Sequence, residues 1–212
     1  MKRDPWIFTG GPFNTNAYLV PSPKGYLCFD APDGLADFLR EEGIQLEALI
    51  LTHGHLDHVW DAETVREQQA CMVYAHPEDE RLLRNPSQGE FFGIPWRFRP
   101  LQEYQRLQVP LRGKIEWELA GRRFVVFHVP GHSPGSLAFY EKAKRRIFSG
   151  DVLFAGSVGR WDIPGGSRDE LLETLRRCFC TLPDDTTIYP GHGPPTTVRQ
   201  EKESNGFLTD FS

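Results

Sequence analysis

The feature that most constrains this chain is a run of three histidines and one aspartate within six residues, His53-Gly54-His55-Leu56-Asp57-His58. The run follows the apolar stretch 48–51, which predicts a buried strand. Four titratable groups crowded at one strand end would repel one another or lose hydration unless an ion compensates them. Imidazole nitrogen and carboxylate oxygen are ligands of zinc, iron and manganese. The chain is therefore expected to fold around a metal site, and the density of ligands favours more than one ion.

Three further histidine or aspartate residues stand at the ends of predicted strands. They are His132 in Pro-Gly-His-Ser-Pro-Gly, Asp151 in Ser-Gly-Asp and His192 in Pro-Gly-His-Gly-Pro, after strands expected at 124–129, 146–148 and 187–189. Glycine beside each of them lets the backbone turn sharply and approach a ligand. Together with the first run they suit two ions about 3.5–4 Å apart that share one carboxylate. The two other histidines, His76 and His128, are expected to be structural.

Short apolar or alternating runs, separated by glycine and proline turns, predict the secondary structure. Strands are expected at 6–8, 17–20, 26–29, 46–51, 72–74, 115–119, 124–129, 137–140, 146–148 and 187–189, and helices at 34–42, at 61–69 and after a capping box at 167–170. This order is compatible with two packed sheets and outer helices. We expect a single domain spanning 1–212, without a separate C-terminal helical domain.

Composition and charge disfavour several functions. The chain has 212 residues and a net charge of -5, with no basic block beyond 142–146, which disfavours nucleic-acid binding. No apolar stretch reaches the roughly 18–20 residues of a membrane span, and no apolar signal-peptide core follows residues 1–6. We therefore expect a cytoplasmic protein without membrane or nucleic-acid partners, and the oligomeric state stays open. The expected reduced thiols are Cys28, Cys71, Cys178 and Cys180.

The segment 84–111 is rich in proline and aromatic residues and has no helical or strand period. Its aromatic side chains include Phe91, Phe92, Trp96 and Phe98. The segment is either a connecting loop packed by its aromatics or a loop that covers a substrate beside the metal site. In the second case Phe92 and Trp96 are the candidate substrate contacts.

The order of these motifs resembles the metallo-β-lactamase superfamily. The resemblance runs from Asn16 to about Leu208 and rests on H-G-H-L-D-H at 53–58, P-G-H-S-P-G at 130–135, S-G-D at 149–151 and P-G-H-G-P at 190–194. It implies an α/β fold, a four-layer αββα sandwich of two mixed sheets with outer helices. It also implies that His53, His55 and His132 hold one metal ion, that Asp57, His58 and His192 hold a second, and that Asp151 bridges them.

Within the superfamily, the segments 156–166 and 205–208 are similar to those of short glyoxalase-II-like hydrolases. Full-length glyoxalase II has an extra C-terminal helical domain that contacts glutathione, and only about twenty residues follow His192 here. Persulfide dioxygenases, which use one iron, share much of the pattern, including a G-R-x-D element that residues 159–162 match. Arg160 is a candidate for binding a substrate carboxylate, and a structural pair with Asp162 is the alternative.

These patterns predict a metal-dependent hydrolase that uses a metal-bound hydroxide. Two divalent ions, zinc first with iron or manganese as alternatives, make hydroxide available at neutral pH and polarise a carbonyl. The expected substrate is a small acyl compound, most simply a thioester of the hydroxyacylglutathione type, and Asp57 is expected to orient the water as a catalytic residue. Four alternatives remain: an iron-dependent sulfur dioxygenase, a lactone or phosphodiester hydrolase, a β-lactamase, and a non-catalytic metal-binding scaffold.

Overall fold

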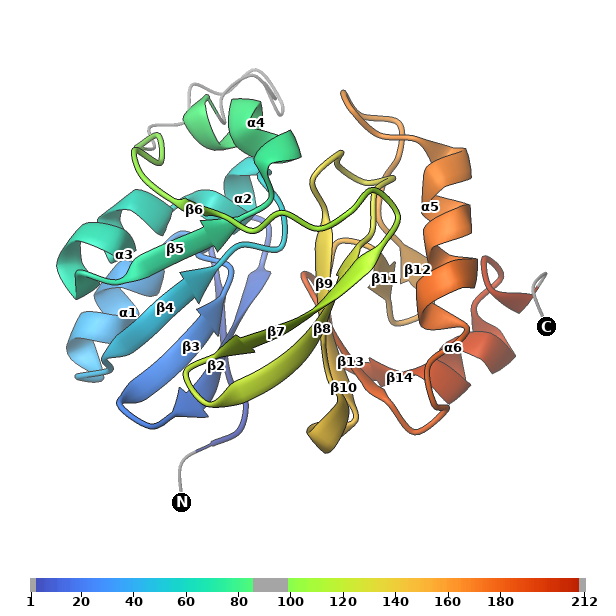
Figure 1. Ribbon diagram of the computed structural model, residues 1–212, viewed down its shortest axis with the longest axis horizontal. Helices are drawn as coiled ribbons and strands as arrows, with labels where there is room; N and C mark the ends of the chain where they lie inside the picture. Colours follow the sequence, from blue (N-terminus) through green and yellow to red (C-terminus); the bar gives the residue numbers. More distant parts are fainter. Residues whose placement is uncertain (1–2, 86–98, 210–212) are drawn as a thin grey trace. The chain divides into compact units, whose positions relative to one another are not determined.

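The computed structural model describes residues 3–85 and 99–209, which form two compact units, Met1–Gln108 and Val109–Ser212 (Figure 1). Each unit is built on its own six-stranded sheet that mixes parallel and antiparallel pairs. The prediction of a single domain spanning 1–212 stays a prediction. In the described part of the chain, no helix has the length and apolarity required to cross a bilayer.

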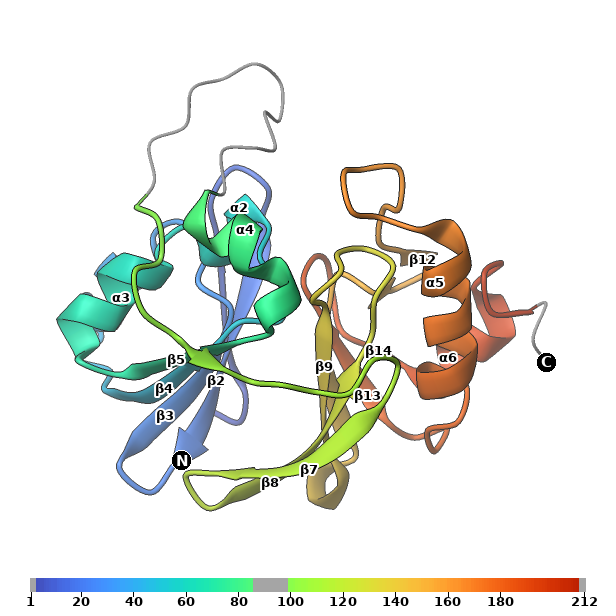
Figure 2. The ribbon, with the colours of Figure 1, turned by 45° about the horizontal axis from the view of Figure 1, so that its top comes forward.

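The sheet of unit 1 has the order β1-β2-β3-β4-β5-β6. The first three strands form an antiparallel meander, and β3 to β6 run parallel. The bounds are β1 Trp6–Gly10, β2 Thr15–Ser22, β3 Gly25–Phe29, α1 Leu35–Glu41, β4 Leu46–Ile50, α2 Leu56–Val59, α3 Ala62–Gln69, β5 Met72–Ala75, a 3-10 turn η1 Pro77–Asp79, α4 Glu80–Arg84 and β6 Gln105–Arg106. Parallel neighbours require crossover connections, and helices α1 (labelled in Figure 1) and α3 (labelled in Figures 1 and 2) supply two of them.

Apolar side chains of these crossover helices bury one face of the sheet. Leu35 and Leu39 of α1 and Val65 of α3 pack with Leu49 of β4 in one core. Because β3 and β4 are parallel and Phe29 pairs with Ile50, the segments that follow both strands leave the sheet at the same edge. This edge carries the histidine run.

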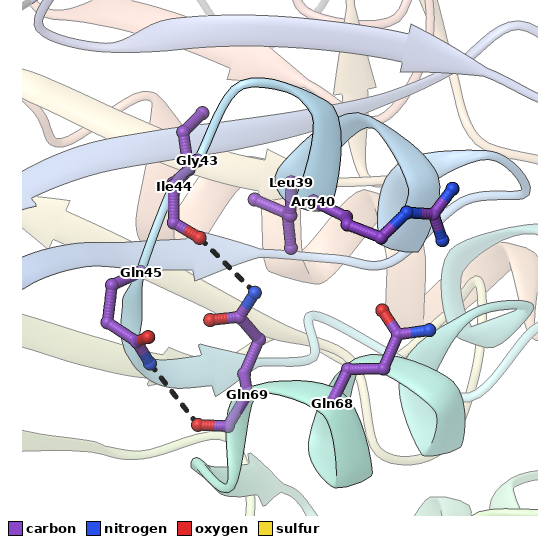
Figure 3. Close-up of a pocket in the computed structure, with 7 residues that line it drawn as sticks. All are labelled: Leu39, Arg40, Gly43, Ile44, Gln45, Gln68 and Gln69. Carbon is purple, nitrogen blue, oxygen red and sulfur yellow. Dashed lines mark hydrogen bonds between the residues drawn. The ribbon is translucent and has the colours of Figure 1, made fainter.

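A hollow of about 530 Å³ lies between the end of α1 and the end of α3 (Figure 3). Gln69 Nε2 donates to the carbonyl of Ile44 at 3.2 Å, and Gln45 Nε2 donates to the carbonyl of Gln69 at 3.2 Å. The Leu46 amide donates to Gln69 Oε1 at 3.1 Å. These bonds tie α3 to the start of β4, and we therefore assign this hollow a structural role.

The sheet of unit 2 has the order β14-β13-β10-β9-β8-β7. The strands β8, β10 and β13 share one direction, because β9 is antiparallel to β8 and β10, and β10 is parallel to β13. The bounds are β7 Lys114–Leu119, β8 Arg122–His128, β9 Leu137–Glu141, a 3-10 turn η3 Lys142–Lys144, β10 Arg146–Gly150, β11 Leu153–Phe154, β12 Ser157–Val158, α5 Arg168–Thr174, a π-helical turn η4 Leu175–Phe179, β13 Thr187–Pro190, β14 Thr196–Thr197 and α6 Val198–Ser204. Strands β11 and β12 form a separate hairpin.

A buried carboxylate fixes this hairpin to the C-terminal helix. Glu201 is fully buried and accepts hydrogen bonds from the Gly156 amide, the Asn205 side-chain amide and the Thr196 hydroxyl, at 2.9, 2.8 and 2.6 Å. Asn205 Nδ2 also donates to the carbonyl of Ser157 at 3.1 Å. The C-terminal segment therefore stabilises the hairpin that follows Asp151.

Most predicted elements are confirmed within a few residues, but two local expectations are corrected. The capping box forms only in part: Ser167 Oγ accepts from the Glu170 amide, whereas the Glu170 carboxylate binds Arg112. The segment 84–111 contains a short strand, β6. A strand of two residues is too short to show an alternating pattern in the sequence. The thiols are free as predicted, and burial raises the pKa values of Cys71 and Cys178 to about 11.

Candidate metal centre

The first ligand cluster, His53, His55, Asp57 and His58, lies in the loop after β4 and in α2. The ring centroids of His53 and His58 are 4.1 Å apart, and those of His53 and His55 are 4.8 Å apart. All three imidazoles are buried. The Thr15 hydroxyl donates to Asp57 Oδ2 at 2.7 Å and thereby fixes this carboxylate. Buried polar groups lose their hydration and need hydrogen-bond partners within the protein. The partner at each ring nitrogen therefore indicates whether that nitrogen donates or accepts.

Asp30, directly after β3, organises this cluster. One oxygen accepts the Thr52 amide at 2.7 Å, and the other lies 2.8 Å from both the Thr52 hydroxyl and His58 Nδ1. His58 therefore carries its proton on Nδ1. Because the Thr52 hydroxyl hydrogen goes to Asp30, Thr52 Oγ1 is left to accept from His53 Nδ1 at 3.0 Å. Both rings thus keep a lone pair on Nε2, the form in which imidazole binds metal.

The second ligand cluster, His132, Asp151 and His192, lies in unit 2 beyond the ends of β8, β10 and β13. Because these strands run in the same direction, their C-terminal ends lie at one edge of the sheet. His132 Nε2 is 3.5 Å from Asp151 Oδ2, and His192 Nε2 is 3.3 Å from the same oxygen. His132 Nδ1 lies 2.8 Å from the carbonyl of Arg160, which accepts its proton and leaves the Nε2 lone pair toward Asp151.

The donor set of each cluster fits a divalent cation. In the first cluster His58 Nε2 faces Asp57 Oδ2 at 3.4 Å, and in the second His132 Nε2 faces Asp151 Oδ2 at 3.5 Å. A nitrogen lone pair and a carboxylate oxygen repel each other at such a distance unless a cation binds both. The hydrogen bonds at Nδ1 orient the Nε2 atoms of both rings toward this position, as the outer partners of histidine ligands do in metal sites.

Gly159 is packed against the second ligand cluster. A Cβ atom at this position would lie 1.8 Å from the carbonyl oxygen of Asp151 and 3.2 Å from His132 Nδ1. Any side chain would therefore displace the backbone that carries these two ligands. Glycine is required here by close approach, as the glycine-rich pattern of residues 156–166 suggests.

The predicted structural histidines make hydrogen bonds that explain their burial. His76 caps the turn η1 by accepting from the Glu78 amide at 3.3 Å. His128 Nδ1 accepts from the Arg112 amide at 3.1 Å, and its Nε2 donates to the carbonyl of Pro134 at 2.8 Å. The structural role predicted for both histidines is therefore confirmed.

Sequence reasoning missed Asp30 and Thr15, and also Asp79, which accepts the Gly54 amide at 2.9 Å. Asp30 carried a usable indication, because it follows a buried strand just as Asp151 does. It lacks a flanking glycine, although its φ of 62° places it in the left-handed region. Thr15 and Asp79 lie far from the run in sequence and show no comparable pattern.

Replacing Asp30 tests its positioning role. In Asp30→Asn one acceptor oxygen becomes a donor and the negative charge is lost, so the side chain can no longer accept from the Thr52 amide as well as from the Thr52 hydroxyl and His58 Nδ1. We expect the metal affinity of the first cluster to fall by about 10- to 100-fold, with activity recovered at high metal concentration. Metal titration of the purified variant measures this. An unchanged dissociation constant, equal to that of the exposed-site control Asp162→Asn, would contradict the role.

The family comparison decides the identity of the fold. Residues 10–192 match the model of the metallo-beta-lactamase superfamily, which is most of the chain and includes both ligand clusters. The chain belongs to the metallo-beta-lactamase superfamily.

Superfamily relatives resemble the chain over nearly its full length. "Probable metallo-hydrolase YqgX" of Bacillus subtilis is 35% identical, covering 95% of this chain and 96% of the relative. "Hydroxyacylglutathione hydrolase GloC" of Haemophilus influenzae is 36% identical, covering 94% and 95%. The chain is accordingly a metallo-hydrolase of this superfamily.

Solved structures of the superfamily agree with the fold. TTHA1623, crystallised in a di-iron-bound form, has a TM-score of 0.84 and 37% identity, with 96% of this chain and 100% of that chain covered. BLEG-1, a B3 metallo-beta-lactamase, has a TM-score of 0.87 and 33% identity, covering 97% and 99%. The predicted fold class, two mixed sheets with helices in the metallo-β-lactamase fold, is confirmed.

The proposed substrate contacts Phe92 and Trp96 lie outside the described residues.

Proposed function

We propose that this metallo-hydrolase is a binuclear enzyme that hydrolyses thioesters of the hydroxyacylglutathione type. The observation that carries the proposal is the hydrogen-bond pattern of the ligand clusters, in which His53, His58 and His132 each have Nδ1 within 3.0 Å of an oxygen, an arrangement that suits ligation through Nε2. The likeness to GloC over both chains supports the choice of substrate class. Full-length likeness supports it more than a shared motif would.

The proposed centre joins the two ligand clusters. His53, His55 and His132 would hold one ion, Asp57, His58 and His192 the other, and Asp151 would bridge them. The di-iron form of TTHA1623 supports two ions, and we propose zinc, with iron or manganese as alternatives. The ions would supply Lewis acidity, which makes hydroxide available near neutral pH and polarises the substrate carbonyl.

The chain's own residues would prepare this chemistry. Thr15 holds the Asp57 carboxylate, which can then orient the attacking water. Asp30 and the carbonyl of Arg160 keep His58 and His132 in the ligating form. A thiol has an ordinary pKa near 8.5, so the leaving sulfur departs as thiolate without a general acid from the protein.

We propose Arg160 as the residue that binds the substrate carboxylate. Its guanidinium forms a two-bonded pair with Asp162, at 2.9 and 3.1 Å, and lowers the pKa of that carboxyl. Both side chains are more than half exposed, so solvent screens the pair and Arg160 can exchange partners readily.

The Arg160→Lys variant tests this contact. Lysine keeps the charge but loses the planar fork, so we expect KM for an anionic thioester to rise about 3- to 10-fold while kcat stays unchanged. Steady-state kinetics with S-lactoylglutathione measure both constants. An unchanged KM would contradict a substrate contact and would favour a structural role for Arg160, in its pair with Asp162.

The choice among reactions is tested by one panel of substrates. We expect kcat/KM for S-lactoylglutathione to exceed that for a β-lactam by at least about 100-fold, without oxygen consumption. The β-lactam is included because BLEG-1 is a B3 metallo-beta-lactamase. Glutathione persulfide, with an oxygen electrode, tests the dioxygenase alternative. Faster turnover of the β-lactam, or oxygen uptake with the persulfide, would overturn the thioester proposal.

A further inference from the structure

A hollow of about 580 Å³ lies on the sheet of unit 2, apart from the ligand clusters. We call it the basic hollow, because four cations line it: Arg112, Lys114, Lys142 and Arg177. Glu116 is the only carboxylate among its lining residues in the described part of the chain. Its volume lies within the range of roughly 300–1,000 Å³ for small-molecule sites.

Three of the four cations have no carboxylate partner among residues 3–85 and 99–209. Arg112 binds Glu170 at 3.0 Å, whereas no ion pair within 4.0 Å involves Lys114, Lys142 or Arg177. The chain as a whole carries a net charge of -5. Positive charge gathered in one hollow of an acidic protein creates a local potential that attracts anions.

Arg177 lines this hollow from a π-helical turn. The Cys180 amide donates to the carbonyl of Leu175 at 3.0 Å, which makes residues 175–179 a π-helical turn. Such turns are rare and are frequent at functional sites. One guanidinium nitrogen of Arg177 donates to the carbonyl of His128 at 3.0 Å, while its Nε is buried and has no hydrogen-bond partner within the described residues. The guanidinium is thus anchored at one end only.

The floor of the basic hollow is apolar. Strand pairing sets Lys114 opposite Phe127, and Val125 opposite Tyr140, so these side chains share one face of the sheet. Lys114 Nζ lies 5.9 Å from the ring centroid of Phe127. An apolar floor beneath several cations suits a ligand that has both an anionic and an apolar part.

We propose that the basic hollow binds an organic phosphate, with the phosphate against the cations and an apolar or aromatic portion on the floor. Several cations suit a multiply charged phosphate better than a single carboxylate, and arginine and lysine are the usual phosphate-binding side chains. The site is independent of the proposed hydrolysis, since none of its lining residues belongs to a ligand cluster.

The test is calorimetric titration of the metal-loaded protein with ADP, and separately with inorganic pyrophosphate. We expect the variant Lys114→Gln/Lys142→Gln to bind ADP at least about tenfold more weakly than the natural chain. The matched control is Lys24→Gln/Arg123→Gln, which removes the same charge elsewhere and should bind ADP normally. Any phosphate bound by the metal ions contributes equally in all three proteins. A difference in ADP affinity between the two variants therefore measures binding in the basic hollow.

Three results would overturn the proposal. They are equal ADP affinity in the hollow variant and its control, no ADP binding by the natural chain at millimolar concentration, and pyrophosphate binding as tight as that of ADP. The last result would show that the apolar floor takes no part. Thioester hydrolysis by the hollow variant is expected to be unchanged, so failure of this proposal is distinct from failure of the proposed function.

Discussion

Asp151→Ala is expected to remove both metal ions together and to lower kcat/KM by at least about 1,000-fold. The carboxylate is nearly buried, and one of its oxygens lies 3.5 Å from His132 Nε2 and 3.3 Å from His192 Nε2. No other carboxylate among the described residues lies between two histidine nitrogens of unit 2 in this way. Elemental analysis and thioester kinetics on the same preparation measure the two losses.

The matched control for this change is Asp162→Ala, which removes an exposed carboxylate of the same unit. It should keep two ions per chain and most of the turnover. If Asp151→Ala retained full metal content, or lost metal while keeping its activity, the bridging role of Asp151 would be wrong.

Gly159→Ala is expected to lower the free energy of unfolding by about 3 kcal/mol and to weaken metal binding at the same time. The added methyl would sit 1.8 Å from the Asp151 carbonyl oxygen, which belongs to the backbone and cannot rotate away. Relief requires a shift of the segment that carries Asp151 or of the loop that accepts the His132 proton. Denaturant unfolding of the metal-free protein separates the steric effect from the loss of metal.

Gly206→Ala provides the control, because a Cβ there meets no atom within 4 Å and the backbone is not in the left-handed region. Its stability should change by less than about 0.5 kcal/mol. Equal stability of Gly159→Ala and Gly206→Ala would show that the backbone near Asp151 can shift at little cost in free energy. Glycine would then not be required at position 159.

The candidate ligand positions could be picked out from the sequence because strand ends have a local pattern, and their role as metal ligands stays a prediction. Each of His132, Asp151 and His192 follows an apolar run and stands beside glycine or proline, and the structure sets them beyond parallel strands. The direction of those strands had to come from pairing that joins distant segments, such as β10 with β13. Proximity of ligands therefore followed from topology rather than from motif alone.

The supporting residues were harder to predict because their contacts are long-range. Asp30 lies 28 positions before its partner His58, and Thr15 lies 42 positions before Asp57. The π-helical turn at 175–179 also has no local pattern, since its apolar residues fit an ordinary helix. Arg177 lies in this turn and lines the basic hollow, a site that no motif indicated.

Anomalous diffraction from crystals of the metal-loaded protein tests the central claim most directly. The proposed centre predicts two metal peaks about 3.5–4 Å apart, with Asp151 between them and histidines of both ligand clusters around them. Two peaks separated by much more than this distance, each held by one cluster alone, would contradict a shared centre. A single iron peak beside His53, His132 and Asp151 would contradict it as well and would favour the dioxygenase alternative.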